Sequence, residues 1–293
     1  MKIESIAAET GMGAVHLAVT DGDRALRFYR DYVGLMPLES EDDEIRLGAA
    51  GRELLVLYPG AEQPVVPKTS GLYHLAIVVP DRRELARVIA RLGNLRWDQY
   101  PTDHVMTKAN YLWDPDGNGI EIYVESPEDG TMRMVNGTYG AWDKEGRPRS
   151  GRDPIDLEEM FSHLLPGDRL DDPMPAGTKM GHVHLHVADV EDALRFYHDL
   201  VGFDVMGHMA GMGFVSAGGY HHHLGLNTWA GRGAQPAPPG AAGLRRFTIE
   251  LPTKRDLDDV ASRLERGEVQ VSEVDDGFAA VDPSSNRIVF RAA

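Results

Sequence analysis

The sequence predicts an α+β protein built from four modules, each a strand, a helix and three further strands. M-G-A-V-H-L-A-V-T-D, from Met12, recurs as M-G-H-V-H-L-H-V-A-D, from Met180. Each copy precedes almost the same apolar-periodic segment, A-L-R-F-Y-R-D-Y-V-G-L at 25–35 and A-L-R-F-Y-H-D-L-V-G-F at 193–203. Self-similarity of this kind is typical of duplicated architectures. The four modules span 12–60, 71–125, 180–230 and 243–292.

The helix and strand assignments rest on spacing and on turn residues. Leu, Phe and Tyr of the two helical segments fall at helical spacing, and Gly34 and Gly202 stand where a C-terminal glycine ends a helix. The second and fourth modules share another unit, Y-H-L-A-I-V-V-P-D-R-R-E-L from Tyr73 and R-F-T-I-E-L-P-T-K-R-D-L from Arg246. Each of these units leads to a D-P turn and a strand, which completes the module.

Length and duplication together predict three parts. A chain of 293 residues is long enough for two domains. The duplication predicts an N-terminal two-module domain at 1–125 and a C-terminal one at 180–293. The polar segment 126–179 is predicted to be a linker, with a short amphipathic helix at D-L-E-E-M-F-S-H-L-L.

Composition excludes several classes of function. The chain has no cysteine, which excludes disulfides, zinc–cysteine sites and cysteine nucleophiles and fits a reducing cytoplasm. Its formal net charge is -16 without a basic cluster, so nucleic acid and anionic membranes are unexpected partners. No apolar run is long enough for a membrane span or a signal peptide. We expect a cytoplasmic protein that acts on a small molecule; assembly into a homo-oligomer is left open.

The stretch from His104 to Glu121 carries the chemistry. H-V-M-T-K-A-N-Y-L-W-D-P-D-G-N-G-I-E places His104 and Tyr111 before a D-P-D-G turn, and Glu121 on the strand that follows. Alternation turns Glu121 to the face opposite Ile120 and Ile122. A carboxylate directed into a sheet interior is costly unless it is paired or binds a metal. Because the strand starting at Tyr73 also carries His74, the sequence predicts a metal site.

Four modules with metal ligands on their strands resemble the vicinal oxygen chelate superfamily, and the stretch 102–121 resembles the signature of its extradiol ring-cleaving dioxygenases. One position departs from that signature, where Asn110 replaces an aliphatic residue. The resemblance extends to G-G-Y-H-H-H-L-G-L-N-T-W, from Gly218, which is similar to Bacillus-type catechol dioxygenases. It implies modules paired into two curved mixed-sheet half-barrels, one of which wraps a divalent metal.

The resemblance also implies roles for particular residues. His74 and Glu121 match metal ligands, and His104 and Tyr111 match groups that hold the substrate. A third metal histidine and an acid/base histidine would come from the partner module. The acid/base histidine falls among His221, His222 and His223, where alternation directs His222 to one face and its neighbours to the other.

The third ligand depends on which modules pair. If the second module pairs with the first, His16 is the third ligand, but no histidine on the third strand of the first module serves as acid/base. If it pairs with the third module, His184 is the ligand and the triple histidine supplies the acid/base group. At the positions that correspond to His74 and Glu121, the fourth module has Arg246 and Val289, so it cannot complete a metal site with His184. We favour this crossed pairing, with His16 as a vestige and His182 and His186 as packing or supporting residues.

Two imidazoles and one carboxylate suit iron(II), with manganese(II) as the alternative, and leave adjacent positions for a catechol-type diol and O2. The resemblance implies that the reaction is extradiol cleavage of an aromatic diol. Two other functions remain open: a glyoxalase-type metal-dependent isomerase or lyase, and a metal-free small-molecule-binding protein of the resistance type. A ring-cleaving enzyme for another substrate, such as a hydroquinone, is a third.

Overall fold

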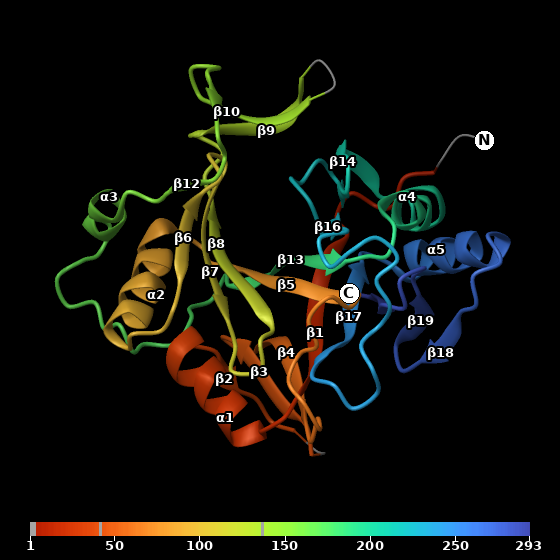
Figure 1. The fold of residues 1–293 in the computed structure, drawn as a ribbon, viewed down its shortest axis with the longest axis horizontal. Coiled ribbons are helices and arrows are strands. Elements are labelled where there is room, and N and C mark those ends of the chain that lie inside the picture. Colours follow the sequence, from red (N-terminus) through yellow and green to blue (C-terminus); the bar gives the residue numbers. More distant parts are fainter. Residues whose placement is uncertain (1–3, 41–42, 136–137) are drawn as a thin grey trace. The chain divides into compact units, whose positions relative to one another are not determined.

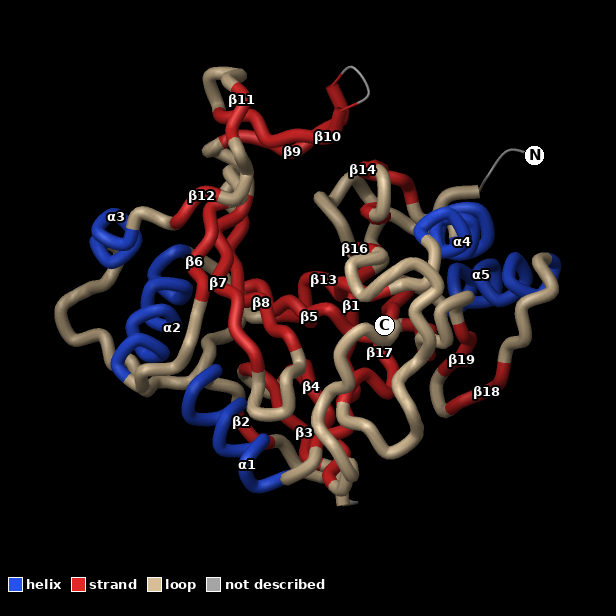
Figure 2. Tube along the Cα trace, viewed as in Figure 1, coloured by secondary structure: helices blue, strands red, loops and turns tan. Residues whose placement is uncertain are grey.

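A computed structural model of the chain describes residues 4–40, 43–135 and 138–293, and its helices and strands are shown in Figures 1 and 2. The chain folds into two compact units, whose segments alternate along the sequence. Unit 1 comprises Met1–Ala18, Glu62–Tyr73 and Gly181–Ala293, and unit 2 comprises Val19–Ala61 and His74–Met180. The α+β class is confirmed. The division at 125 and 179 stays a prediction about the repeats.

Unit 2 holds the remainder of the first module, the second module from His74 onwards and the linker. Its elements in chain order are α1 (Gly22–Arg27), the π-helical segment η1 (Phe28–Val33), β2 (Met36–Pro37), β3 (Ile45–Ala49), β4 (Arg52–Pro59), β5 (Gly71–Val78), α2 (Arg82–Asn94), β6 (Tyr100–Asp103), β7 (Thr107–Trp113), β8 (Gly119–Glu125), β9 (Gly130–Val135), β10 (Thr138–Asp143), β11 (Pro148–Arg149), β12 (Asp153–Pro154) and α3 (Leu157–Ser162). Strands run in the orders β12-β6-β7-β8-β5, β4-β3-β2 and β11-β10-β9.

The sheet of the second module has one face that is covered by α2. Asp81 caps this helix by accepting a hydrogen bond from the Glu84 backbone N–H at 3.0 Å. Apolar residues on one side of α2 and on the facing side of β5, β7 and β8 are almost fully buried, which is the alternation that the sequence predicts. They are Leu75, Ile77, Leu85, Ile89, Leu92, Leu112, Ile120 and Ile122. The opposite face of the same strands is therefore left for the site residues.

Unit 1 contains the first strand of the first module and the whole of the third and fourth modules. Its elements are β1 (Gly11–Val19), β13 (Lys179–His186), α4 (Val190–Leu194), the π-helical segment η2 (Arg195–Val201), β14 (Asp204–Met209), β15 (Met212–Ser216), β16 (Leu224–Asn227), β17 (Gly243–Leu251), α5 (Lys254–Arg266), β18 (Ser272–Val274), β19 (Gly277–Val281) and β20 (Arg287–Ala292). The strand orders are β18-β19-β20-β17-β1 and β13-β16-β15-β14.

Crossed pairing is visible within unit 1. Strand β1 of the first module pairs antiparallel with β17 of the fourth, and His16 stands opposite Arg246. Tyr73, at the start of the second module, packs its ring 5.1 Å from the rings of His184 and Trp229 in the third module. The crossed arrangement that the sequence favours is thus confirmed for the first and fourth modules, and the Tyr73 contacts agree with it for the other two.

The helices predicted before Gly34 and Gly202 are present, and each ends at its glycine. Both glycines have a left-handed backbone, with φ of 99° and 100°. The sequence did not predict that the second half of each helix is a π-helix, η1 and η2. Each π-helical segment buries a Phe-Tyr pair, and the two tyrosines, Tyr29 and Tyr197, donate hydrogen bonds to buried aspartates.

The two D-P turns are built alike in the two units. Tyr29 Oη donates to Asp114 Oδ2 at 2.9 Å, and Tyr197 Oη donates to Asp282 Oδ2 at 3.0 Å. Asp114 also accepts hydrogen bonds from the backbone N–H groups of Asp116 and Asn118, as Asp282 does from those of the corresponding residues of its turn. The D-P-D-G turn, which pointed to chemistry in the sequence, therefore also anchors the π-helix of the preceding module.

The linker contains more structure than predicted. Its short helix is confirmed as α3, but β9, β10, β11 and β12 were not expected, because the polar residues of this segment carry no clear period. Buried arginines of α2 tie the linker down: Arg87 and Arg91 donate to the carbonyl of Asp172 at 2.8 and 2.6 Å. Burial lowers the pKa of Arg91 to about 10. Within the described ranges no helix has the length and hydropathy of a membrane span.

The ion pair between Asp168 of the linker and Arg83 of α2 is expected to stabilise the fold in a pH-dependent way. Hydrogen bonds from Arg83 and the Leu165 backbone N–H lower the pKa of Asp168 to about 2. An unfolded aspartate titrates near pH ~3.9, so the stabilisation is complete above that pH and is lost as pH falls towards 2. We expect Asp168→Asn to lower the urea midpoint near pH 6, with a difference from wild type that shrinks towards pH 3. Asp171→Asn, at a highly exposed pair with Arg169, is the control; a difference for Asp168→Asn that does not change with pH would contradict the assignment.

Candidate metal and active site

His74, Tyr111 and Glu121 lie on neighbouring strands of unit 2, on the face that α2 does not cover. Tyr111 of β7 stands directly opposite Glu121 of the antiparallel β8, and β5 runs parallel to β8 with Ala76 beside Glu121. His74 Nε2 lies 3.0 Å from Glu121 Oε2, and the two residues are only 4% and 3% exposed. The ring of Tyr111 lies 5.5 Å from that of His74. The sequence-predicted pair is thus brought together in a buried setting.

His104 joins this group through Tyr111. Its Nε2 lies 2.8 Å from the Tyr111 hydroxyl, and its Nδ1 lies 2.6 Å from the carbonyl oxygen of Gly151 in the linker. The turn between β6 and β7 carries His104, so the imidazole reaches back over β7 to meet Tyr111. All four residues that the sequence selected in the second module therefore form one connected set.

In unit 1, His182 of β13 lies among the triple histidine. Its ring is 4.1 Å from that of His222 and 5.8 Å from that of His221, and it is 1% exposed. One nitrogen from each of these three imidazoles lies within 4.8 Å of the other two, close enough to hold a metal ion after small adjustments. Sequence reasoning took His182 for a packing or supporting residue.

His184, the ligand predicted from the sequence, has different surroundings within unit 1. Its ring lies 5.1 Å from Tyr73, 5.5 Å from Trp229 and 6.0 Å from Phe214. It also covers Gly225, where an added Cβ would lie 2.7 Å from His184 Cγ. Gly225 is therefore a glycine because the imidazole occupies the space above it. This aromatic packing is typical of a core histidine.

The expected alternation of the triple histidine is wrong. His221 and His222 both approach His182, while His223 lies elsewhere: its Nδ1 accepts a hydrogen bond from the Ala217 backbone N–H at 3.2 Å and lies 2.8 Å from Ser216 Oγ. The physical reason is that β16 begins only at Leu224, so the three histidines belong to a loop and the two-residue period of a strand does not apply.

The donor set fits a divalent transition metal. Imidazole nitrogen and carboxylate oxygen are ligands that iron, manganese and zinc accept, and a buried carboxylate is costly unless it is paired or binds a metal. His74 and Glu121 supply one of each at 3.0 Å, and β13 carries His182, His184 and His186 at alternate positions. His186 Nδ1 lies 2.7 Å from Asn227 Oδ1, which supports a packing role for that residue.

Alternation on β13 groups His182 with His184 and His186 and does not choose among them. Residues 182, 184 and 186 share one face of the strand, so alignment of His184 with His16 did not by itself decide which of them faces a site. The rings around the two differ: His182 lies beside His221 and His222 of the loop before β16, and His184 lies beside Trp229. His16 itself lies on β1 opposite Arg246, within the pair formed by the first and fourth modules.

Comparisons with known proteins agree with the fold and the duplication. The profile of the Glyoxalase/Bleomycin resistance protein/Dioxygenase superfamily matches residues 11–122 and 179–288. A catechol-2,3-dioxygenase of Bacillus subtilis (strain 168) is 40% identical over 290 residues, which are 97% of this chain and 98% of that protein.

Two solved structures share the fold. A putative dioxygenase from Bacillus subtilis subsp. subtilis str. 168 has a TM-score of 0.65 at 13% identity and covers 99% of this chain and 86% of its own. Glyoxalase I from Zea mays has a TM-score of 0.58 at 13% identity, with 96% and 92% covered. The profile spans most of the chain in two copies, and the chain therefore belongs to the Glyoxalase/Bleomycin resistance protein/Dioxygenase superfamily.

Proposed function

We propose that this chain is an extradiol ring-cleaving dioxygenase, which inserts both atoms of O2 into a catechol-type aromatic diol at a mononuclear iron(II) site. One observation carries the proposal. A buried histidine–carboxylate pair, His74 and Glu121, shares a sheet face with Tyr111, whose hydroxyl contacts His104, in a chain that is 40% identical to a catechol-2,3-dioxygenase. Manganese(II) is the alternative metal because it accepts the same ligands.

The third ligand is proposed to come from β13. The sequence assigns it to His184, but the packing of His184 among Tyr73, Trp229 and Phe214 favours a structural role. His182 is the better candidate, because its ring lies beside His221 and His222 in a group suited to holding a metal ion. The proposed ligand set is thus two histidines and one carboxylate: His74, Glu121 and, in place of His184, His182.

The residues of the chain would divide the work as follows. When bound, the metal supplies Lewis acidity and a template for a chelating diol and O2. Tyr111 would hold the substrate by a hydrogen bond, and His104 would orient the Tyr111 hydroxyl. A histidine of the loop before β16 moves the substrate protons; His222 and His221 suit this role, because His223 is held by Ser216 and Ala217.

The ligand assignment predicts different losses in single variants. We expect His182→Ala to lose most bound iron and to slow catechol cleavage by about 100-fold or more, since the loss of even a supporting contact at a metal site costs about 10- to 100-fold in affinity. His184→Ala should keep iron and cost stability, and His16→Ala should change neither. Iron content and O2 uptake with catechol would be measured on protein that is purified and iron-loaded without oxygen.

The same assay separates the alternatives. If His184→Ala loses iron and O2 uptake while His182→Ala stays active, the third ligand is His184, as predicted from the sequence. Iron-loaded wild-type protein that takes up no O2 with catechol would contradict the dioxygenase proposal. Isomerisation of the methylglyoxal–glutathione adduct by that protein would point to glyoxalase chemistry instead, and failure to bind any metal would favour a binding protein.

A further inference from the structure

The turn that carries His104 has a strained backbone. Between β6 and β7, the His104 backbone N–H donates to the Thr107 carbonyl at 3.0 Å and the Met106 N–H donates to the His104 carbonyl at 2.9 Å. Val105, between them, has φ of 71°. A β-branched residue rarely adopts this left-handed conformation, which persists only where the surrounding structure imposes it. The turn must therefore be held by contacts outside its own backbone.

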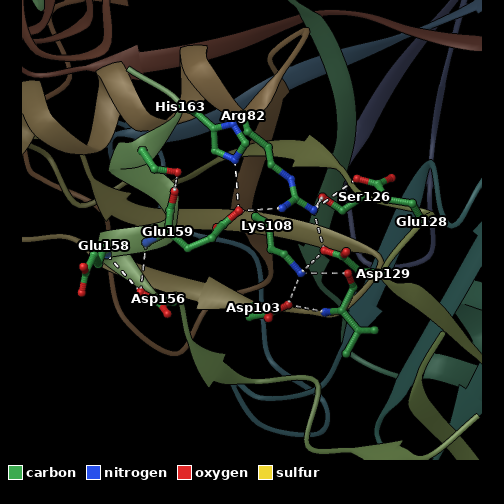
Figure 3. Close-up of polar contacts among 12 residues, drawn as sticks. Arg82, Asp103, Lys108, Ser126, Glu128, Asp129, Asp156, Glu158, Glu159 and His163 are labelled. Carbon is green, nitrogen blue, oxygen red and sulfur yellow. Dashed lines mark hydrogen bonds and ion pairs between the residues drawn. The ribbon is translucent and has the colours of Figure 1, made fainter. Parts of the chain in front are cut away.

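A charged cluster around Lys108 supplies those contacts (Figure 3). Lys108 is 7% exposed, and its Nζ donates to the Val105 carbonyl at 3.0 Å and lies 2.7 Å from Asp103 Oδ1 and 2.8 Å from Asp129 Oδ2. Asp103 Oδ1 also accepts the Val105 backbone N–H at 2.7 Å. One ammonium group thus ties both sides of the turn to the start of the linker.

Asp129 connects this cluster to the rest of the linker. Arg82 of α2 lies 2.5 Å from Asp129 Oδ2 and 3.1 Å from Glu159 Oε1 of α3 (Figure 3). Burial raises the pKa of Asp129, but the hydrogen bonds and charges of Lys108 and Arg82 outweigh it and hold that pKa below its usual range. The carboxylate is therefore charged at neutral pH, and the cluster stays intact.

The contacts of His104 fix the direction of its hydrogen bonds. A carbonyl oxygen only accepts, so the 2.6 Å contact with Gly151 requires that Nδ1 carries a proton in every charge state of the ring. In the neutral imidazole Nε2 is then an acceptor, and the Tyr111 hydroxyl at 2.8 Å must donate to it. The Tyr111 oxygen can consequently accept hydrogen bonds from other donors through its lone pairs.

We propose that the linker acts as a positioning element for the active site, in which the Gly151 carbonyl selects the Nδ1–H tautomer of His104 and so makes Tyr111 a hydrogen-bond acceptor towards the substrate. Lys108 and Gly151 are positioning residues, because they act through His104. The inference rests on the proposed function for its substrate: an acceptor at Tyr111 suits a diol whose hydroxyl at this position keeps its proton. With the opposite tautomer, Tyr111 would instead donate to an ionised oxygen.

Gly151 offers a direct way to disturb the tautomer. Its φ is 66°, and an added Cβ would lie 2.9 Å from Ala141 Cβ on β10, so Gly151→Ala must move the backbone that carries the carbonyl. Adding Ala141→Gly removes that contact and should return the carbonyl towards His104. For the charged cluster, Lys108→Met removes the ammonium group at similar length. Arg83→Met is the matched control, since Arg83 also ties α2 to the linker, through Asp168, without touching the turn.

The readout is the ring 15N spectrum of the metal-free protein labelled in its 12 histidines, with the His104 signals assigned by their loss in His104→Gln. We expect a protonated Nδ1 in wild type, in Gly151→Ala/Ala141→Gly, in Lys108→Arg and in Arg83→Met. Gly151→Ala and Lys108→Met should shift His104 to mixed tautomers and, in the iron-loaded enzyme, raise the KM for catechol about 10-fold at unchanged iron content.

Three results would overturn the inference: a wild-type His104 with its proton on Nε2, an unchanged tautomer in Gly151→Ala, or an equal effect of Arg83→Met and Lys108→Met. The spectra need neither metal nor turnover. A wild-type protein with the Nδ1–H tautomer but without O2 uptake would therefore reject the proposed function and leave the role of the linker in place.

Discussion

Glu121→Ala is expected to abolish iron binding and reduce catechol cleavage by at least about 100-fold, because a direct ligand contributes more than the supporting contacts whose loss costs about 10- to 100-fold. Glu121 is 3% exposed and its Oε2 lies 3.0 Å from His74 Nε2. Its removal leaves an imidazole without the carboxylate that completes the face. Iron content after anaerobic loading and O2 uptake with catechol measure the two losses.

Two further variants show whether the effect belongs to the carboxylate itself. Glu121→Asp keeps the charge on a shorter side chain and should recover part of the iron binding. Glu125→Ala, four residues further along β8 and more exposed, removes an acidic residue from the same strand and should keep both activities. Full iron binding and turnover in Glu121→Ala, in a folded protein, would exclude Glu121 as a ligand.

Asp114→Ala is expected to cost about 3 kcal/mol or more of unfolding free energy in the metal-free protein, since each buried hydrogen-bond donor left without its partner costs about 1–3 kcal/mol. Asp114 is 5% exposed. Its carboxylate accepts hydrogen bonds of 2.8–2.9 Å from the Tyr29 hydroxyl, from the backbone of Asp116, and from the backbone and side chain of Asn118. Burial raises its pKa, while these hydrogen bonds act in the opposite direction.

The duplication supplies a matched comparison for this prediction. Asp282 accepts the corresponding hydrogen bonds from Tyr197 and from the turn of the fourth module, so Asp282→Ala should cost a similar amount. Tyr29→Phe and Tyr197→Phe remove one donor each and should cost about 1 kcal/mol. Urea unfolding of the set measures the differences. Losses below about 1 kcal/mol for both aspartate variants would mean that the turns do not anchor the π-helices.

Repeated and periodic features were predictable from the sequence. The four modules, the helix-ending glycines Gly34 and Gly202 and the inward direction of Glu121 all follow from local patterns that recur in the chain. The empty positions of the fourth module, Arg246 and Val289, also indicated the crossed pairing, because a site needs all of its ligands. That reasoning is supported by the opposition of His16 and Arg246 on β1 and β17.

Features that depend on long-range packing were not predictable. The choice between His182 and His184 depends on rings from the loop before β16 and on Trp229, which no local pattern reveals. The triple histidine was assigned to the same strand as the Leu-Gly-Leu that follows it, whereas β16 begins only at Leu224. The linker strands were not predicted because the polar residues of this segment carry no clear period. The role of the linker beside His104 depends on a single backbone carbonyl, that of Gly151.

The most direct test of the proposed reaction is the fate of labelled oxygen. Iron-loaded wild-type protein would be given catechol under 18O2, and the product would be analysed by mass spectrometry. The account predicts a ring-cleaved semialdehyde that carries both atoms of one 18O2 molecule, and no such product from Glu121→Ala. Unconsumed catechol and O2 in the presence of fully iron-loaded protein would contradict it.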